Sequence, residues 1–120
     1  ASSVNLVVSY YTLQFMQSDQ RVAAVNKAYE LLQPDGAMIL FEKVISDNAI
    51  IQDMFSQTYS EFKVENGFSE KEIMSKTQSL KSVMKSRDDS YIVRELFSAG
   101  FTSVDQVFSW MNFRGYLAVK

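Results

Sequence analysis

A helix, a tight turn and a continuous apolar strand follow one another in the first third of the chain, and this order narrows the possible folds most. Apolar residues at three- and four-residue spacing predict the helix over about residues 19–33, with Ser18 as its N-cap. Pro34-Asp35-Gly36 predicts a turn. The strand at 37–41 has no polar residue, which indicates burial on both faces. With an apolar strand at residues 4–9, these elements predict a right-handed β-α-β unit of a parallel sheet.

Three further helices and two strands are predicted after this unit. A capping box, Ser69-Glu70-Lys71-Glu72, marks one helix start, with Phe68 and Ile73 placed to staple across it. The predicted helices cover about 48–66 (capped by Ser46 or Asp47 and ended by Gly67), 70–84, and from Ser86 or Asp88 to Gly100. The predicted strands cover 104–108 and 115–119, joined around 112–115. The order β-α-β-α-α-α-β-β predicts a single α/β domain over residues 1–120.

Composition excludes several classes of site. The chain has no histidine and no cysteine, which removes the commonest general base, the usual nucleophile pairs and the usual zinc ligands. No EF-hand-like loop is present, and Asp88-Asp89 is better explained as a helix cap than as a metal site. We therefore expect no metal site.

Charge and hydropathy also restrict the partners. Basic residues between 63 and 87 alternate with acidic ones, which favours a solvated helix face over a nucleic-acid surface. The net charge of −2 supports the same conclusion, so no direct nucleic-acid binding is expected. The chain has neither an apolar run long enough to cross a membrane nor a basic leader, and a cytoplasmic location is the default expectation.

Several sequence blocks together resemble a known family. They are Val7-Val8-Ser9-Tyr10-Tyr11-Thr12-Leu13-Gln14-Phe15, Leu40-Phe41-Glu42-Lys43, residues 61–73, Ala99-Gly100-Phe101 and Trp110-Met111-Asn112-Phe113. The chain resembles the C-terminal half of carboxy-S-adenosylmethionine synthases, which have the class I methyltransferase fold and supply a carboxymethyl donor for tRNA wobble-uridine modification. The segment Phe-Lys-x-x-Asn-Gly-aromatic-Ser-Glu-x-Glu-Ile, residues 62–73, carries the resemblance most specifically.

The resemblance implies a partial Rossmann-like sheet. The family's seven strands run in the order 3-2-1-4-5-7-6 with the seventh antiparallel, and this chain would hold strands four to seven. The glycine-rich loop that holds the cofactor lies in the family's other half, and this chain contains no glycine-rich strand-to-helix turn. The isolated chain is therefore expected to bind no cofactor, unless a surviving site holds S-adenosylmethionine or its carboxy derivative.

Five residues are candidates for that site. Glu42 and Lys43 match the family at the carboxyl end of a strand, although a solvated or locally bonded pair would look the same. Tyr10 and Tyr11 could stack on an adenine or a nucleobase, or could fill the core or an interface. The resemblance implies a cofactor-binding asparagine where Tyr10 stands, and a carboxylate-binding arginine where Thr77 stands. Neither substitute reproduces the lost contact, so carboxyl-group chemistry of the family type is not expected.

Two functions are compatible with the sequence. One is a methyltransferase-like module that is not catalytic alone, has no catalytic residue of its own and acts through a homodimer or a protein partner. That partner would cover the strand at 4–9, whose edge is apolar and uncharged. The aromatic cluster of Trp110, Met111 and Phe113 could serve the core or a subunit contact. The alternative is a fragment or subunit of an S-adenosylmethionine-dependent enzyme of tRNA wobble-uridine modification.

Overall fold

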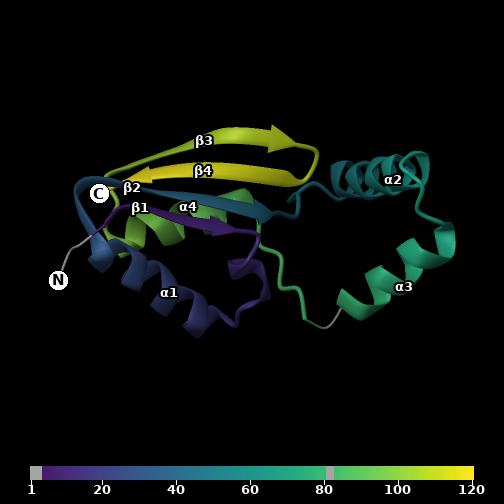
Figure 1. Cartoon of the computed structure of the whole chain (residues 1–120). Helices are drawn as coiled ribbons and strands as arrows, with labels where there is room; N and C mark the ends of the chain where they lie inside the picture. Colours follow the sequence, from purple (N-terminus) through teal and green to yellow (C-terminus); the bar gives the residue numbers. More distant parts are fainter. Residues whose placement is uncertain (1–3, 81–82) are drawn as a thin grey trace.

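The computed structural model describes residues 4–80 and 83–120 and confirms the predicted order of elements (Figure 1). The strands are β1 (Val4–Tyr10), β2 (Leu32–Lys43), β3 (Ser103–Trp110) and β4 (Phe113–Val119). The helices are α1 (Ser18–Leu31), α2 (Ala49–Glu65), α3 (Glu70–Leu80) and α4 (Asp89–Ala99), with a short 3-10 turn, η1 (Leu13–Phe15), after β1.

The strands form one mixed sheet in the order β1-β2-β4-β3. β1 is parallel to β2, as the β-α-β unit requires, and β4 is antiparallel to both of its neighbours. This is the arrangement expected for strands four to seven of the methyltransferase sheet, so the α/β fold class is confirmed. The carboxyl ends of β1 and β2 lie together at one end of the sheet, where ligands bind in folds of this kind.

One face of the sheet packs against α1 and α4 and carries the core. Alternate residues of β2, Met38 and Leu40, point to this face and are buried against Val25 of α1 and the α4 residues Ile92 and Leu96. The opposite face of β2 is only half-buried, so the prediction that strand 37–41 is buried on both faces is wrong. A continuous apolar run cannot distinguish the two cases, because what decides burial is whether a second layer covers the other face.

The turn predicted at Pro34-Asp35-Gly36 lies inside β2 rather than before it. Val4 pairs with Leu32 while Leu6 pairs with Ala37, so β2 bulges at these residues. Asp35 has φ 66°, which is the left-handed conformation that turn residues tolerate. The turn residues therefore bend the strand, and α1 already ends at Leu31.

Other predicted boundaries shift for local reasons. Ser18 is the first residue of α1, and Gln17 occupies the N-cap position that was expected of Ser18. Asn48, not Ser46 or Asp47, caps α2 by accepting a hydrogen bond from the Ile51 amide at 3.1 Å. Met84 lies beyond the end of α3 at Leu80, and the hairpin turn is shorter than predicted because β4 already begins at Phe113. Residues 81 and 82, within the predicted helix 70–84, lie outside the described residues.

Two caps are confirmed. The Ser69 hydroxyl accepts a hydrogen bond from the Glu72 amide at 3.1 Å, and the Glu72 carboxylate accepts one from the Ser69 amide at 3.3 Å. Asp88 accepts from the Tyr91 amide at 2.8 Å and begins α4. The predicted helix starts at these two positions are therefore correct.

Helices α2 and α3 form an arm that extends beyond the end of the sheet (Figure 1). Neither helix contains a buried residue, whereas α1 buries Arg21, Val25 and Ala28 and α4 buries Ile92 and Leu96. The arm gives the molecule an elongated shape, with principal extents of 48 × 24 × 23 Å. The base of the arm lies next to the carboxyl ends of β1 and β2, so the arm contributes side chains to that end of the sheet.

Gly100 ends α4 in a position that a larger residue cannot occupy. Its φ is 118°, and a Cβ there would lie 2.8 Å from the Tyr29 ring. We expect Gly100→Ala to lower the free energy of unfolding by about 2 kcal/mol or more, from backbone strain and the clash together. Gly67→Ala is the matched control, because Gly67 has φ 95° and open space around it. Urea unfolding should show the smaller loss for Gly67→Ala; equal losses would exclude the clash with Tyr29.

Candidate functional site

The site is built where β1 and β2 end and the arm begins (Figure 1). Tyr10 ends β1, Tyr11 follows it with φ 55°, and Lys43 ends β2. The Tyr11 amide donates a hydrogen bond to the Phe41 carbonyl at 3.0 Å, which holds the Tyr11 backbone beside β2. The structure thus brings Tyr10, Tyr11 and Lys43 to the same end of the sheet.

Aromatic rings line this end of the sheet, on the face that α1 and α4 do not cover. The ring centroids of Tyr10 and Tyr11 lie 4.7 Å apart, and Tyr11 lies 5.8 Å from Phe113 of β4. Phe113 lies 5.1 Å from Tyr59 of α2 and 5.7 Å from Trp110 of β3. The rings therefore connect the ends of β1, β3 and β4 to the arm. Trp110 is 40% exposed, so this cluster is not part of the enclosed core.

Lys43 lies against the same rings. Its Nζ is 5.1 Å from the Tyr59 ring centroid and 5.8 Å from that of Phe113. Burial, together with repulsion from Lys63 and Lys76, lowers the pKa of Lys43 below its usual range. Lys63 contacts the same Tyr59 ring, with its Nζ 4.3 Å from the centroid. Burial and repulsion from Lys76 lower the pKa of Lys63 as well.

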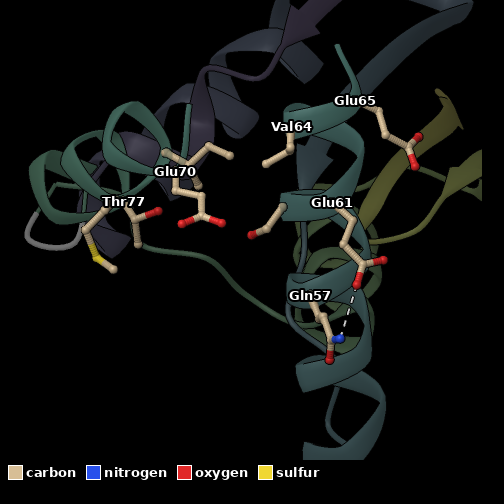
Figure 2. A pocket seen from close by; sticks show the side chains of 9 residues that line it. Gln57, Glu61, Val64, Glu65, Glu70 and Thr77 are labelled. Atoms are coloured by element: carbon tan, nitrogen blue, oxygen red, sulfur yellow. Dashed lines mark hydrogen bonds between the residues drawn. The ribbon is translucent and has the colours of Figure 1, made fainter. Parts of the chain in front are cut away.

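Lys43 and Thr77 line one cavity of about 730 Å³ between this end of the sheet and the arm. Thr77 also lines a second cavity of about 710 Å³ between α2 and α3, which Figure 2 shows from close by. This second cavity has an acidic lining of Glu61, Glu65 and Glu70, and Gln57 donates a hydrogen bond to Glu61 at 3.2 Å. Thr77 thus stands between a cavity with lysines and a cavity with glutamates.

Glu42 lies on the other face of the sheet, away from Lys43. Its side chain is fully buried beneath α1 and α4, where it forms an ion pair with Arg21 of α1. Arg21 Nε also donates to both carboxylate oxygens of Glu95 in α4, at 2.8 and 3.0 Å. Burial raises the pKa of both carboxyl groups against the lowering effect of Arg21. The structure therefore separates Glu42 from the other four candidates and places it in a buried triad.

Three residues that matter here, Arg21, Lys63 and Lys76, were not predicted as site residues from the sequence. A signal for Arg21 existed: it stands four residues before Val25, in register with the buried positions of α1. Glu42 similarly alternates with Met38 and Leu40 along β2, so its burial follows from the period of the strand. The lysines carried no such signal, because residues 43, 63 and 76 come together only through the packing of the arm.

Metal chemistry gains no support from the described part of the chain. Residues 4–80 and 83–120 contain no group of three potential metal ligands close enough to hold an ion. Asp88 is occupied as the cap of α4, and Asp89 accepts a hydrogen bond from the buried Tyr116 hydroxyl. Burial, together with that contact, raises the pKa of Tyr116.

Comparison with known proteins supports the resemblance carried by the motifs. No family model matches the chain. It is 34% identical over 115 residues to a carboxy-S-adenosyl-L-methionine synthase of Wolinella succinogenes, and 36% identical over 118 residues to one of Methylococcus capsulatus. These alignments cover 96% and 98% of the chain but 48% and 49% of the relatives. The chain is homologous to carboxy-S-adenosyl-L-methionine synthases. It spans about half their length.

Solved structures with a similar fold include S-adenosylmethionine-dependent methyltransferases. The biosynthetic protein PhzM aligns with 100% of the chain and 31% of its own length, at a TM-score of 0.67 and 15% identity. Human N-acetylserotonin methyltransferase, solved with S-adenosylmethionine, aligns with 97% of the chain and 29% of its own length, at a TM-score of 0.61 and 15% identity. The fold of this chain is therefore part of the methyltransferase fold. Among the helices of the described residues, none is long and apolar enough to span a membrane.

Proposed function

We propose that this chain is a methyltransferase-like half-domain that has no catalysis of its own and acts by associating with a second polypeptide segment. The observation that carries the proposal is the uncovered edge and face of β1. Leu6, Val8 and Tyr10 alternate along this strand and are 53%, 56% and 69% exposed. Three large apolar side chains in a row at a sheet edge form a surface that proteins normally cover.

The chemistry of β1 favours a pairing partner. The strand contains no charged residue and no proline, the two features that most often protect an edge from pairing. β1 pairs with β2 on one side, and no strand of the described residues pairs with its other side. The backbone groups on that side are therefore free to accept another strand, from a second copy or from a different chain.

The open face of the sheet extends this surface beyond β1. Phe108 of β3 is 42% exposed, and its ring lies 6.2 Å from that of Phe41 of β2, which is half-buried on the same face. The described helices that pack on the sheet, α1 and α4, both cover the opposite face. A partner that contributes helices as well as a strand would therefore bury the greatest apolar area.

A second candidate function is supported by the homology. A chain 34–36% identical to carboxy-S-adenosyl-L-methionine synthases could be a fragment or subunit of such an enzyme, and through it part of tRNA wobble-uridine modification. The ligand would then be S-adenosylmethionine or its carboxy derivative. It could be contacted by the residues around the end of the sheet where β1 and β2 terminate, which are Tyr10, Tyr11, Lys43 and Thr77. Glu42 could act only through the orientation of β2, since it faces the buried triad.

The residues present fit this cofactor only in part. The exposed Tyr10 ring offers a stacking surface, and the lysines suit an acid group. The described residues include no glycine-rich turn between a strand and a helix that could hold the adenosyl moiety. The half-domain hypothesis accounts for this combination, because a partner would supply the missing contacts.

Calorimetry can separate the two functions. We expect no saturable heat when the chain alone is titrated with S-adenosylmethionine to millimolar concentration. We expect one-to-one binding after the chain is mixed with the glycine-rich half of a curated relative, expressed separately. Saturable binding by the chain alone would contradict the half-domain proposal and favour an independent cofactor site. Absence of binding in the mixture, with complex formation shown by sedimentation, would contradict the cofactor assignment.

A further inference from the structure

The cavity of about 710 Å³ between α2 and α3 is lined by one face of each helix. The α2 lining consists of Gln57, Ser60, Glu61, Val64 and Glu65, and the α3 lining consists of Glu70, Ile73, Met74 and Thr77. Residues three, four and seven positions apart lie on the same face of an α-helix. Each helix therefore presents one continuous stripe to a common groove, which we call the arm groove (Figure 2).

The floor of the arm groove is apolar and uncovered. Val64 is 47% exposed, Met74 is 60% exposed and Ile73 is half-buried. Neither α2 nor α3 contains a buried residue, so the arm has no core of its own. The 11 residues of α3 make a helix that is marginal in water unless it packs against other elements. A third helix laid along the arm groove would bury this floor and complete a small bundle.

Three carboxylates flank the apolar floor. Glu61 and Glu65 lie one turn apart on α2, and Glu70 points toward them from α3 (Figure 2). No lysine or arginine is among the described residues that line the arm groove, and no ion pair of the described residues includes one of these glutamates. The carboxylates therefore repel anionic surfaces such as nucleic acid and acidic membranes, and they favour a partner with basic side chains one turn apart.

We propose that the arm groove docks a basic amphipathic helix of a partner protein. The apolar side chains of that helix lie on Val64, Ile73 and Met74, and its lysines or arginines pair with the three carboxylates. Every residue of the arm groove belongs to α2 or α3, so this inference goes beyond the association through β1 and does not rest on it. The arm groove can dock its helix whether or not a partner covers β1.

Fluorescence anisotropy with two labelled peptides and the full chain tests the proposal. The first peptide has about 14 residues, roughly 21 Å of helix, which exceeds the length of α3. It carries leucines at three- and four-residue spacing and lysines on both flanks, and the second peptide has glutamate in place of each lysine. We expect saturable one-to-one binding of the basic peptide and at least ten-fold weaker binding of the acidic one. No saturable binding of the basic peptide, or equal binding of both, would overturn the proposal.

Charge-matched variants locate the site. Glu65→Gln/Glu70→Gln should weaken binding of the basic peptide at least ten-fold, while Asp53→Asn/Asp105→Asn removes the same charge from exposed positions outside the arm groove and should leave binding within two-fold. Equal weakening by both would show a general charge effect and overturn the proposal. Glu65→Lys/Glu70→Lys should reverse the preference, so that the acidic peptide binds more tightly. If that variant instead abolishes self-association in sedimentation velocity, the occupant is a second copy of the chain, and the assignment to a basic partner is wrong.

A second pair of variants tests the apolar floor. Val64→Ser/Met74→Ser should also weaken binding of the basic peptide at least ten-fold. Ile50→Ser/Met54→Ser is the matched control, because both residues are exposed on α2 but do not line the arm groove. Equal binding by the two double variants would show that the peptide contacts only the charges and would overturn docking in the groove. If Val64→Ser/Met74→Ser loses helix content by circular dichroism, Met74→Ser alone provides the test.

Discussion

Replacing Arg21 with methionine is expected to lower the free energy of unfolding by about 3–5 kcal/mol, because it leaves buried carboxyl groups without their cation. Arg21 is fully buried and contacts two carboxylates from different elements, Glu42 of β2 and Glu95 of α4. Without Arg21, Glu42 must either stay ionised in an apolar environment or bind a proton. Urea unfolding followed by circular dichroism measures the loss.

Two further variants identify the cause of that loss. Arg21→Met/Glu42→Gln should recover part of it, because the second substitution removes the buried charge that Arg21 had neutralised. Arg94→Met is the control on the surface of α4, where the side chain is exposed, and should change stability by less than about 0.5 kcal/mol. A loss for Arg21→Met no larger than that for Arg94→Met would show that the buried triad does not stabilise the fold.

The triad also explains why Glu42 supports two different interpretations. Its place at the end of a strand, and its match to the family, suggested a cofactor contact. Its alternation with Met38 and Leu40 places it instead on the helix-covered face, opposite Lys43. Adjacent strand residues point to opposite faces, so Glu42 and Lys43 could not both face one ligand. The two-residue period of the strand is therefore enough to separate them.

The parts of the fold that the sequence predicted are those set by local chemistry. The Ser69 capping box, the Asp88 cap and the order of elements follow from short-range patterns. The uncovered face of β2 and the clustering of Lys43, Lys63 and Lys76 do not, because both depend on which layers pack where. Alternating lysines and glutamates on α2 and α3 indicated a solvated face, and the sequence carried no signal that the two charges line different cavities.

The largest expected effect on assembly comes from β1. We expect the unmodified chain to associate at tens of micromolar, because the apolar face of β1 at Leu6 and Val8 and its free backbone edge would both be covered by a partner. Val8→Lys places a charge in the centre of this surface, where pairing would bury it. Sedimentation velocity should then show a monomer at the same concentration, with an unchanged circular dichroism spectrum.

Val22→Lys is the matched control for this experiment. Val22 is 46% exposed, but it lies on α1, on the opposite side of the sheet from the exposed face of β1. The same change of charge and size there should leave association intact. A clean monomer for the unmodified chain at tens of micromolar would exclude self-pairing, and the uncovered edge would then require a different chain. If Val8→Lys and Val22→Lys both dissociated the assembly equally, association would depend on general apolar contact and not on β1. An interface at the edge of β1 would be disrupted by Val8→Lys alone.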